Sequence, residues 1–467
     1  MERAQRPASV CALTPPDVFL HDTRSGELRR LQPADPPKVR IYACGPTVYG
    51  RVHVGNARPF VVFSQLKRFL DAVGYETEFV ANITDINDKI YAAAAAAGIP
   101  SDRLALEMTG AYVADTDRFG LGRPDHEPRA SLTIGPIIAL IERLIETGHA
   151  YVADGDVLFS VRSYPAYGGL SHRDVDQMDQ GEGIEGSDRK RDPLDFALWK
   201  AQKPGEDTSW DSPWGPGRPG WHIECSAMAQ ELLGLDFEIH GGGSDLIFPH
   251  HENEDAQTTA ATGTALAQIW MHNGMLRLDA EKMSKSVGNV FGLAEALDRH
   301  GPLTLLMYFS QGHWRQPLEY DEDRLREAAA TAQRIRNAGR RLVPGPSPEW
   351  SASMRAQFFD ALAHDFNTPK ALAVVFEWVT AANRAESGTV GADDLRAMLY
   401  VLGLDRLLEA DDGEVPEAAL ELARMRDAAR RQRDYAEADR LRDELRERGW
   451  EVRDGPSGTE LLPRNRE

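Results

Sequence analysis

Residues 39–83 constrain the fold most, because strand and helix patterns follow one another there in a fixed order. Residues 39–43 form a short apolar run typical of a buried strand. Apolar residues then recur at helical spacing, which predicts a helix that begins near Gly55 and ends at Gly74. Residues 75–83 have the pattern of a second strand. A strand, a helix and a second strand in this order form a crossover between parallel strands, which is nearly always right-handed. We therefore expect the loop before the helix to lie at the carboxyl end of a parallel strand.

This loop carries groups that suit a phosphate and a metal. The free N–H groups at a helix N-terminus attract phosphate. Gly45 and Gly55 allow the backbone to approach a ligand closely, and His53 adds a donor that can carry charge. Cys44 opens the loop with a potential metal-binding thiolate. The loop therefore predicts an enzyme that uses a nucleotide.

Composition restricts the class of protein. The 42% hydrophobic and 27% charged content is that of a globular protein, and 467 residues predict about three domains. We expect neither a secretory signal nor a membrane span, since no apolar run is long enough. Three cysteines (Cys11, Cys44 and Cys225) are no disulfide framework and indicate a cytoplasmic protein. A net charge of −20 argues against general nucleic-acid binding. An arginine cluster at 424–453 is nevertheless compatible with a specific RNA partner that binds there.

The order of patterns along the chain predicts the fold class and the domains. We expect an α/β fold, in which a split, doubly wound (Rossmann-like) parallel-sheet domain contains an insertion and precedes an α-helical bundle and a small C-terminal α+β module. The insertion includes an amphipathic helix and a hairpin with an Asp154-Gly155 turn. The predicted divisions are an N-terminal extension (1–19), the first half of the α/β domain (20–98), the insertion (99–200), the second half with a lysine-rich loop (201–320), the bundle (321–403), a linker (404–416) and the module (417–467).

A second group of candidate ligands lies in residues 220–225 and 240–255. Pro249 suits the first turn of a helix, on which His250 shares a face with Glu254, and His251 with Asp255. Either pair could complete a site with the two later cysteines, giving two sulfurs, one nitrogen and one oxygen. Thiolate and imidazole together favour zinc. The alternative is a solvated acidic helix start beside two buried cysteines, because no CxxC clamp fixes the geometry.

A third motif is the loop Glu281–Asn289, with lysines at 282 and 285 among small residues. Two lysines there suit a clamp on polyphosphate, where positive charge offsets charge that builds up in a transition state. Taken alone, a Lys/Ser loop is usually solvated surface.

Together these motifs resemble a known family. His53-Val-Gly-Asn56 resembles the HIGH motif, and Lys282-Met-Ser-Lys-Ser286 the KMSKS motif, of class I aminoacyl-tRNA synthetases. The surrounding sequence resembles that of cysteinyl-tRNA synthetases from about Leu20 to the C-terminus. The segments that carry this likeness are 44–49 (Cys-Gly-Pro-Thr-Val-Tyr), 82–85 (Asn-Ile-Thr-Asp), 192–196 (Asp-Pro-Leu-Asp-Phe), 220–228 (Gly-Trp-His-Ile-Glu-Cys-Ser-Ala-Met) and 241–252 (Gly-Gly-Gly-Ser-Asp-Leu-Ile-Phe-Pro-His-His-Glu).

The resemblance implies a role for each matching position. The family's zinc ligands fall on Cys44, Cys225, His250 and Glu254. The family positions that shape the cysteine pocket correspond to Thr84, Trp221 and His240. The positions that contact the adenylate correspond to Gly243 and Asp245. The catalytic positions are His53, Asn56, Lys282 and Lys285, and Gly55 and Lys285 are expected to contact ATP. Asn56 departs from HIGH, since asparagine can donate a hydrogen bond to phosphate but cannot carry charge; Asn87 stands where aspartate is common.

The implied reaction joins L-cysteine and ATP into cysteinyl-adenylate, releases pyrophosphate and passes cysteine to the 3′ end of the cysteine tRNA. One Zn2+ per chain, Mg2+ with the ATP, a monomeric state and an anticodon-binding role for the C-terminal module are implied as well. Two alternatives stay open. One is the related ligase that joins cysteine to an amino-sugar in mycothiol synthesis, which should lack the arginine-rich module. The other is a catalytically silent paralogue that only binds RNA or zinc.

Overall fold

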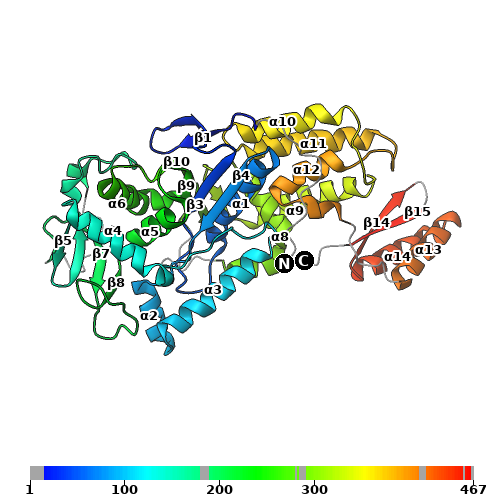
Figure 1. Ribbon diagram of the computed structural model, residues 1–467. Coiled ribbons are helices and arrows are strands. Elements are labelled where there is room, and N and C mark those ends of the chain that lie inside the picture. Colours follow the sequence, from blue (N-terminus) through cyan, green and yellow to red (C-terminus); the bar gives the residue numbers. More distant parts are fainter. Residues whose placement is uncertain are drawn as a thin grey trace. The chain divides into compact units, whose positions relative to one another are not determined.

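The computed structural model describes residues 15–178, 189–278, 281–282, 291–409, 417–455 and 458–463 (Figure 1). The chain divides into two compact units, Met1–Leu408 and Glu409–Glu467. None of the helices in these ranges combines the length and the apolar composition that a bilayer crossing requires.

The first unit is built around a parallel sheet of four strands in the order β10-β9-β3-β4 (Figure 1). Its strands are β3 (Lys38–Ala43), β4 (Glu76–Ala81), β9 (Phe237–Gly243) and β10 (Ala267–Asn273). Helix α1 (Val54–Ala72) joins β3 to β4 in parallel, so the predicted crossover is confirmed, with the helix beginning one residue before Gly55. The split parallel α/β fold predicted from the sequence is therefore confirmed.

Both faces of this sheet are covered, as expected of a doubly wound fold. Ile41, Ile239 and Ile269 point to the side of α1 and belong to the largest hydrophobic cluster. Their neighbours along the strands, such as Tyr42 and Trp270, belong to a second cluster that includes α5 (Trp221–Leu233). The apolar runs in the sequence therefore reflect strands buried on both sides.

The two halves of the sheet meet where β3 pairs with β9. Ile41, Tyr42 and Ala43 pair in register with Ile239, His240 and Gly241. The N–H of Cys44 continues the ladder by donating to the carbonyl of Gly241 at 2.9 Å. A Cβ on Gly241 would lie 2.1 Å from Phe63 Cζ of α1, so no larger residue fits there. This join places residues from distant parts of the sequence at one sheet edge.

The segment between the two halves forms its own antiparallel sheet, in the order β5-β6-β7-β8. Its strands are β5 (Ala150–Ala153), β6 (Asp156–Phe159), β7 (Phe196–Ala201) and β8 (Gly217–Pro219). The predicted hairpin is confirmed: β5 and β6 pair across Asp154 and Gly155, which both have positive φ. Helix α4 (Ile134–Glu146) buries Ile137, Ile141 and Leu144 in this sheet's core.

Helices α2 (Asp88–Ala97) and α3 (Ser101–Asp117) pack against the parallel-sheet core, and the rest of the first unit is mainly helical. The remaining elements of this unit are β1 (Phe19–Asp22), β2 (Glu27–Arg30), α6 (Glu252–Thr262), β11 (Leu276–Leu278), β12 (Glu281–Lys282), α7 (Leu293–His300), α8 (Pro302–Gln311), β13 (Leu318–Glu319), α9 (Glu322–Gly339), α10 (Ser351–Ala363), α11 (Thr368–Arg384) and α12 (Asp393–Leu402). Helices α9 to α12 confirm the helical pattern predicted for this region.

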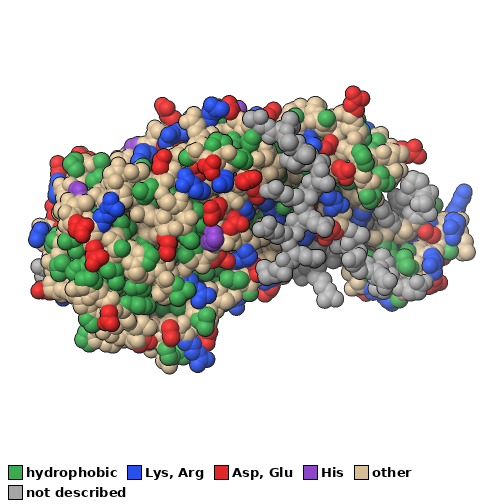
Figure 2. Space-filling view, viewed as in Figure 1, with side chains coloured by type: hydrophobic (Ala, Val, Ile, Leu, Met, Phe, Trp, Pro, Cys, Tyr) green, Lys and Arg blue, Asp and Glu red, His purple; other side chains and the backbone are tan. Residues whose placement is uncertain are grey.

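The second unit consists of two helices and a hairpin. Helices α13 (Glu417–Arg431) and α14 (Tyr435–Glu447) precede β14 (Trp450–Gly455) and β15 (Gly458–Pro463), which pair antiparallel. This is the small α+β module that the sequence predicted. Acidic and basic side chains are interspersed over the face of the protein that Figure 2 shows.

Arg58, in the second turn of α1, joins three segments of the first unit although its side chain is only 1% exposed. Its guanidinium donates to the carbonyls of Gly274 at 2.5 Å and Gln316 at 2.7 Å. Further donations reach the carbonyls of Met275, His313 and Trp314. These carbonyls lie in the two loops that follow β10 and α8, and Arg58 adds a buried donor to each loop.

We predict that Arg58→Met lowers the free energy of unfolding by roughly 3 kcal/mol, because it removes the hydrogen bonds by which the buried guanidinium ties α1 to two loops. The matched control is Arg103→Met on α3, whose arginine is exposed and pairs with Glu107 one turn away, a contact worth only about 0.5 kcal/mol. Urea denaturation followed by circular dichroism measures both. Equal losses in the two variants would contradict a structural role for the buried guanidinium.

Candidate active site and metal centre

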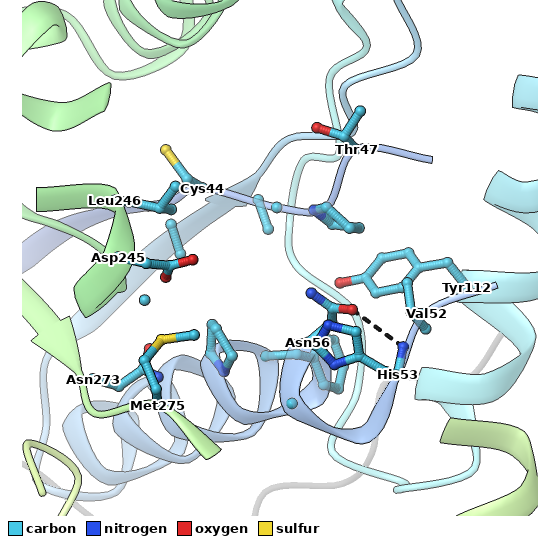
Figure 3. A pocket seen from close by; sticks show the side chains of 18 of the residues that line it. Cys44, Thr47, Val52, His53, Asn56, Tyr112, Asp245, Leu246, Asn273 and Met275 are labelled. Carbon is cyan, nitrogen blue, oxygen red and sulfur yellow. Dashed lines mark hydrogen bonds between the residues drawn. The ribbon is translucent and has the colours of Figure 1, made fainter. Parts of the chain in front are cut away.

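A pocket of about 570 Å³ opens at the carboxyl edge of the parallel sheet. The loop between β3 and α1 forms one wall, and the ends of β9 and β10 contribute another. We call it the loop pocket. Eight of the residues singled out in the sequence line it: Cys44, Gly45, His53, Gly55, Asn56, Trp221, Gly243 and Asp245. In Figure 3, Cys44 and Asp245 lie across the pocket from His53 and Asn56.

The start of α1 explains how asparagine serves at the last position of the HIGH-like motif. The backbone N–H of His53 donates to Oδ1 of Asn56 at 3.1 Å, the dashed line in Figure 3. The side chain of Asn56 thus caps the helix with its oxygen and keeps its amide N–H groups as donors. Since Asn56 lines the loop pocket, those donors are available to an anion there.

Behind Cys44 lies a buried cluster of metal-binding side chains. One ligand atom each from Cys44, His250, His251 and Glu254 lie within 4.8 Å of one another, and all four residues are buried. Oε1 of Glu254 is 3.0 Å from Nε2 of His250 and 3.5 Å from Sγ of Cys44. Sγ of Cys44 is 3.3 Å from Nε2 of His251.

Cys225, on α5, reaches the same cluster from the other side. Its thiol is only 1% exposed and interacts through side-chain hydrogen bonds with Cys44 and His250. Both cysteines are free thiols. The four positions that match the family's zinc ligands therefore lie together, and His251 lies beside them.

The residues expected around the cysteine pocket contact this cluster. The indole of Trp221 stacks on His250 at 4.2 Å between ring centroids, and Nε2 of His240 is 2.8 Å from Oε2 of Glu254. Thr84 is buried, and its carbonyl accepts from the N–H of Val48 in the β3–α1 loop. Trp221 and Pro46 line the loop pocket; Thr84 donates its backbone N–H to the carbonyl of Pro46, whereas His240 contacts the cluster behind the pocket.

One expectation about the His250 segment is confirmed and another needs correction. The chain is helical from Pro249 onward, because the helical turn Ile247–His251 has one non-helical residue, Phe248, and continues into α6 at Glu252. Asp255, one candidate partner of His251, instead pairs with Arg24 at 2.5 Å. Helical spacing could not find this pairing, because Arg24 lies far away in the sequence. His251 itself contacts Cys44, although the family match did not select it.

Part of the predicted site lies beyond what the structure describes. Lys282 is the last residue of β12, which pairs with β11, but its side chain is not described. Lys285 lies outside the described residues. Several described residues of the loop pocket carried no signal in the sequence, among them Lys89, Tyr112 and Met275. Only their positions in the fold bring them to the site.

The two thiols of the cluster have different pKa values, so one is protonated and the other ionised at neutral pH. Burial raises the pKa of Cys44 well above its usual range. Burial also opposes ionisation of Cys225, but hydrogen bonds from Cys44 and His250 outweigh it and lower the pKa of Cys225 to about 6. Burial disfavours the charged form of His250, yet Glu254 and Cys225 raise its pKa to about 10. In the metal-free protein, the Cys225 thiolate and the Glu254 carboxylate therefore lie beside the His250 imidazolium.

This donor set fits a zinc ion. Sulfur, imidazole nitrogen and carboxylate oxygen are the usual ligands of zinc, and the buried setting excludes competing water. Buried ionisable groups at this density are costly unless they are paired or coordinate a metal.

Family models and curated relatives match nearly the whole chain. The family described as "tRNA synthetases class I (C) catalytic domain" matches residues 30–330, "DALR domain" matches 357–404, and "Cysteinyl-tRNA ligase anticodon binding domain" matches 412–460. A "Cysteine--tRNA ligase" of Alkalilimnicola ehrlichii is 48% identical over 457 residues, which covers 95% of this chain and 99% of the relative. The protein of the same name from Halorhodospira halophila is 47% identical, with 94% and 98% covered.

Solved structures with the same fold are more distant. Methionyl-tRNA synthetase of Mycobacterium tuberculosis, in complex with methionyl-adenylate, is 18% identical with a TM-score of 0.55, over 79% of this chain and 90% of that one. A leucyl enzyme of Agrobacterium radiobacter, in a ternary complex titled LeuRS-tRNA-LeuAMS, gives a TM-score of 0.59 at 10% identity, over 82% and 86%. At these identities the likeness concerns the fold alone.

We predict that Zn2+ binding to the metal-free protein releases about two protons per ion between pH 7 and 9. Zinc requires a Cys44 thiolate and a neutral His250, and both pKa values are raised in the empty cluster, so both groups hold protons in this range. Cys225, with its pKa of about 6, contributes almost none. Affinity should therefore rise roughly 100-fold per pH unit across this range.

Chelator competition at several pH values measures the affinity, and an indicator dye in weak buffer counts the protons. His364→Gln, which removes an exposed histidine outside the cluster, should leave the proton count unchanged. Zinc binding that releases no protons at pH 8 would contradict the charge distribution described above.

Proposed function

The chain belongs to the cysteine–tRNA ligase family of class I aminoacyl-tRNA synthetases, and from that premise we propose how its residues carry out two successive steps. It is an ATP-dependent aminoacyl-tRNA ligase. In the first step the carboxylate of L-cysteine attacks the α-phosphorus of ATP, forms cysteinyl-adenylate and releases pyrophosphate. In the second step the adenylate's cysteinyl group passes to the cysteine tRNA.

The nucleotide occupies the loop pocket. Gly243 and Asp245, at the end of β9, bind the adenylate, and Gly55 lets the backbone of α1 approach the phosphates. His53, the amide of Asn56 and the N-terminus of α1 stabilise charge on the phosphates as the pyrophosphate departs. Lys282 and Lys285 of the KMSKS-like loop add positive charge from the second half of the domain. Mg2+ accompanies the ATP.

Catalysis of this kind needs no protein nucleophile. The protein contributes by holding the carboxylate in line with the phosphorus and by presenting fixed donors to the developing charge. The observation that carries the proposal is the geometry of the pocket: the phosphate-binding start of α1 and the buried thiol–imidazole cluster open on one cavity through Cys44.

The cluster of Cys44, Cys225, His250 and Glu254 would hold one zinc ion. Bound there, zinc would accept the thiolate of the substrate, a soft ligand that the hydroxyl of serine cannot imitate. Trp221, Thr84 and His240 shape the cavity around that thiolate and fix the orientation of the ligands. His251, which contacts Cys44, holds the first cysteine in place through its own hydrogen bond to His272 at 2.7 Å.

In the transfer step, a hydroxyl of the tRNA's terminal ribose attacks the cysteinyl carbonyl carbon. The new ester bond forms as the bond to AMP breaks, and the hydroxyl proton is lost to the departing phosphate. The module of residues 417–467 binds the anticodon end. Its arginines pair with acidic residues one turn away, for example Arg440 with Glu437 and Glu444. Such exposed pairs are worth only about 0.5 kcal/mol, so RNA phosphates can replace the acidic partners.

We further propose that the protein is a monomer of the cytoplasm, and we keep the domain division drawn from the sequence. Of the two alternatives, the amino-sugar ligase should lack the C-terminal module, and residues 412–460 match the anticodon-binding family. A silent paralogue would have no reason to keep both the metal-binding cluster and the HIGH-like helix start. Both observations favour the tRNA ligase.

The test of this function combines two assays. The zinc-loaded protein should exchange pyrophosphate with ATP only when cysteine is present, and should prefer cysteine over serine by more than about 10²-fold, the limit of an apolar pocket alone. A chain that ends at Leu408 should keep this exchange but charge the cysteine tRNA at least tenfold more slowly. Transfer of cysteine to an amino-sugar rather than to tRNA would overturn the assignment.

We predict different consequences for two changes at Asn56. Asn56→Asp keeps the oxygen that accepts from the His53 N–H but turns an anion toward the phosphates, so the kcat/KM for ATP should fall about 10²-fold or more, with little loss of stability. Asn56→Ala loses both the cap and the donor, so thermal stability should fall as well. Exchange at varied ATP and a thermal melt separate the two effects. An Asp variant with normal ATP kinetics would show that this side chain only caps the helix.

A further inference from the structure

One cation of the loop pocket has no role in the function proposed above. Lys89 is the single lysine or arginine, and Asp245 the single acidic residue, among the described residues that line this cavity. The substrates expected there, a triphosphate and the end of an RNA, are both strongly anionic. Lys89 therefore adds formal positive charge where the ligands are negative, and the family motifs did not select it.

The position of Lys89 is defined by its neighbours. It is the second residue of α2, and its backbone N–H donates to the capping oxygen of Asn87 at 3.1 Å. Its Nζ lies 5.6 Å from the centroid of the Tyr49 ring, and Tyr49 also lines the pocket. The ring attracts the ammonium group and keeps it on the pocket side of the helix.

Among the described residues, this charge has no acidic partner. Lys89 forms no ion pair with any residue that the structure describes. The adjacent Asp88 is engaged by Lys200 at 2.9 Å and by Arg218. A cation in the first turn also gains nothing from the helix dipole, whose positive end lies there. The expected partner of Lys89 is therefore an anion that enters the pocket.

Helix position alone does not single out Lys89, because exposed lysines are usually only solvated. Lys370 of α11 is equally exposed and donates its backbone N–H to the capping Asn367 in the same way. What distinguishes Lys89 is the pocket. Lys370 thus provides a matched control with the same local structure.

The sheet order indicates which anion Lys89 meets. The strands run β10-β9-β3-β4, and the adenylate contacts Gly243 and Asp245 follow β9. Lys89 follows β4 at the opposite edge of the sheet. The pocket therefore extends past the nucleotide toward β4, and an acceptor that attacks the cysteinyl group must share the pocket with the adenylate.

Resting on the function proposed above, we propose that Lys89 binds the 3′-terminal phosphodiester of the tRNA while the terminal ribose attacks the adenylate. Lys89 is a binding residue of the transfer step. It leaves the activation step to His53, Asn56 and the lysines of the KMSKS-like loop.

The experiment measures the two steps separately in the full-length, zinc-loaded protein. Lys89→Met removes the charge and keeps the length of the side chain. Cysteine-dependent ATP–pyrophosphate exchange should stay within about twofold of wild type. Single-turnover transfer from preformed cysteinyl-adenylate, at subsaturating tRNA, should fall at least tenfold, while Lys89→Arg should keep most of the transfer rate.

A second readout tests the chemistry of the contact. Loss of one phosphate contact should reduce the slope of log kcat/KM for tRNA against log salt by roughly 0.7. Lys370→Met should change neither the transfer rate nor this slope.

Three outcomes would overturn the inference. A loss of exchange as large as the loss of transfer would place Lys89 on the phosphates of ATP instead. Unchanged transfer would leave it a solvated surface lysine, and a transfer defect with an unchanged salt slope would exclude a phosphate contact. If the wild-type protein itself failed to exchange pyrophosphate with cysteine, the proposed function would fall, which is distinguishable from each of these results.

Discussion

The parallel pairing of β3 with β9 is the interaction on which the rest of the site depends. It is short, with three residue pairs and the N–H of Cys44 donating to Gly241. Yet it joins the two halves of an interrupted domain, so that the β3–α1 loop meets the segments after β9. Without this register Cys44 would not face Glu254, and Gly243 and Asp245 would not line the same pocket as His53. Arg58 strengthens the same join, because from α1 in the first half it donates to the carbonyls of Gly274 and Gln316 in the second half.

The buried cluster behind Cys44 follows a different physical rule. Burial opposes every charge in it, and yet Glu254 keeps its pKa well below the usual range because His240 and His250 lie against its carboxylate. Charges this deep persist only when they compensate one another or hold an ion. The histidines behind the cluster are neutral: burial lowers the pKa of His272 to about 3, and it lowers that of His251 as well. A mixed set of charged ligands and neutral supporting rings is what a soft metal site requires.

Local patterns in the sequence predicted the fold class, and the family resemblance supplied the expected roles of most site residues. The strand, loop and helix around Cys44 follow from apolar spacing, because strands buried on both faces read as continuous apolar runs. Local reasoning failed where a partner came from elsewhere in the chain. Helical spacing allowed His251 to pair with Asp255, but Arg24 of the N-terminal hairpin takes that carboxylate. Lys89 gave no signal either, since a lysine in a helix start resembles any solvated residue until the pocket beside it is known.

By itself, the sequence determined which chemistry is present: two thiols, imidazoles, a carboxylate, a helix start that binds phosphate and a lysine-rich loop. These depend on residue type and on spacing within a few positions, which a linear pattern records. Only the tertiary structure decided which groups share a space. Cys44 meets Cys225 and His251 through a sheet that brings strands from both halves together, and Lys89 reaches the pocket because β4 borders it. Contacts between distant residues depend on strand order and register, and these are set by the packing of the whole core rather than by any single segment.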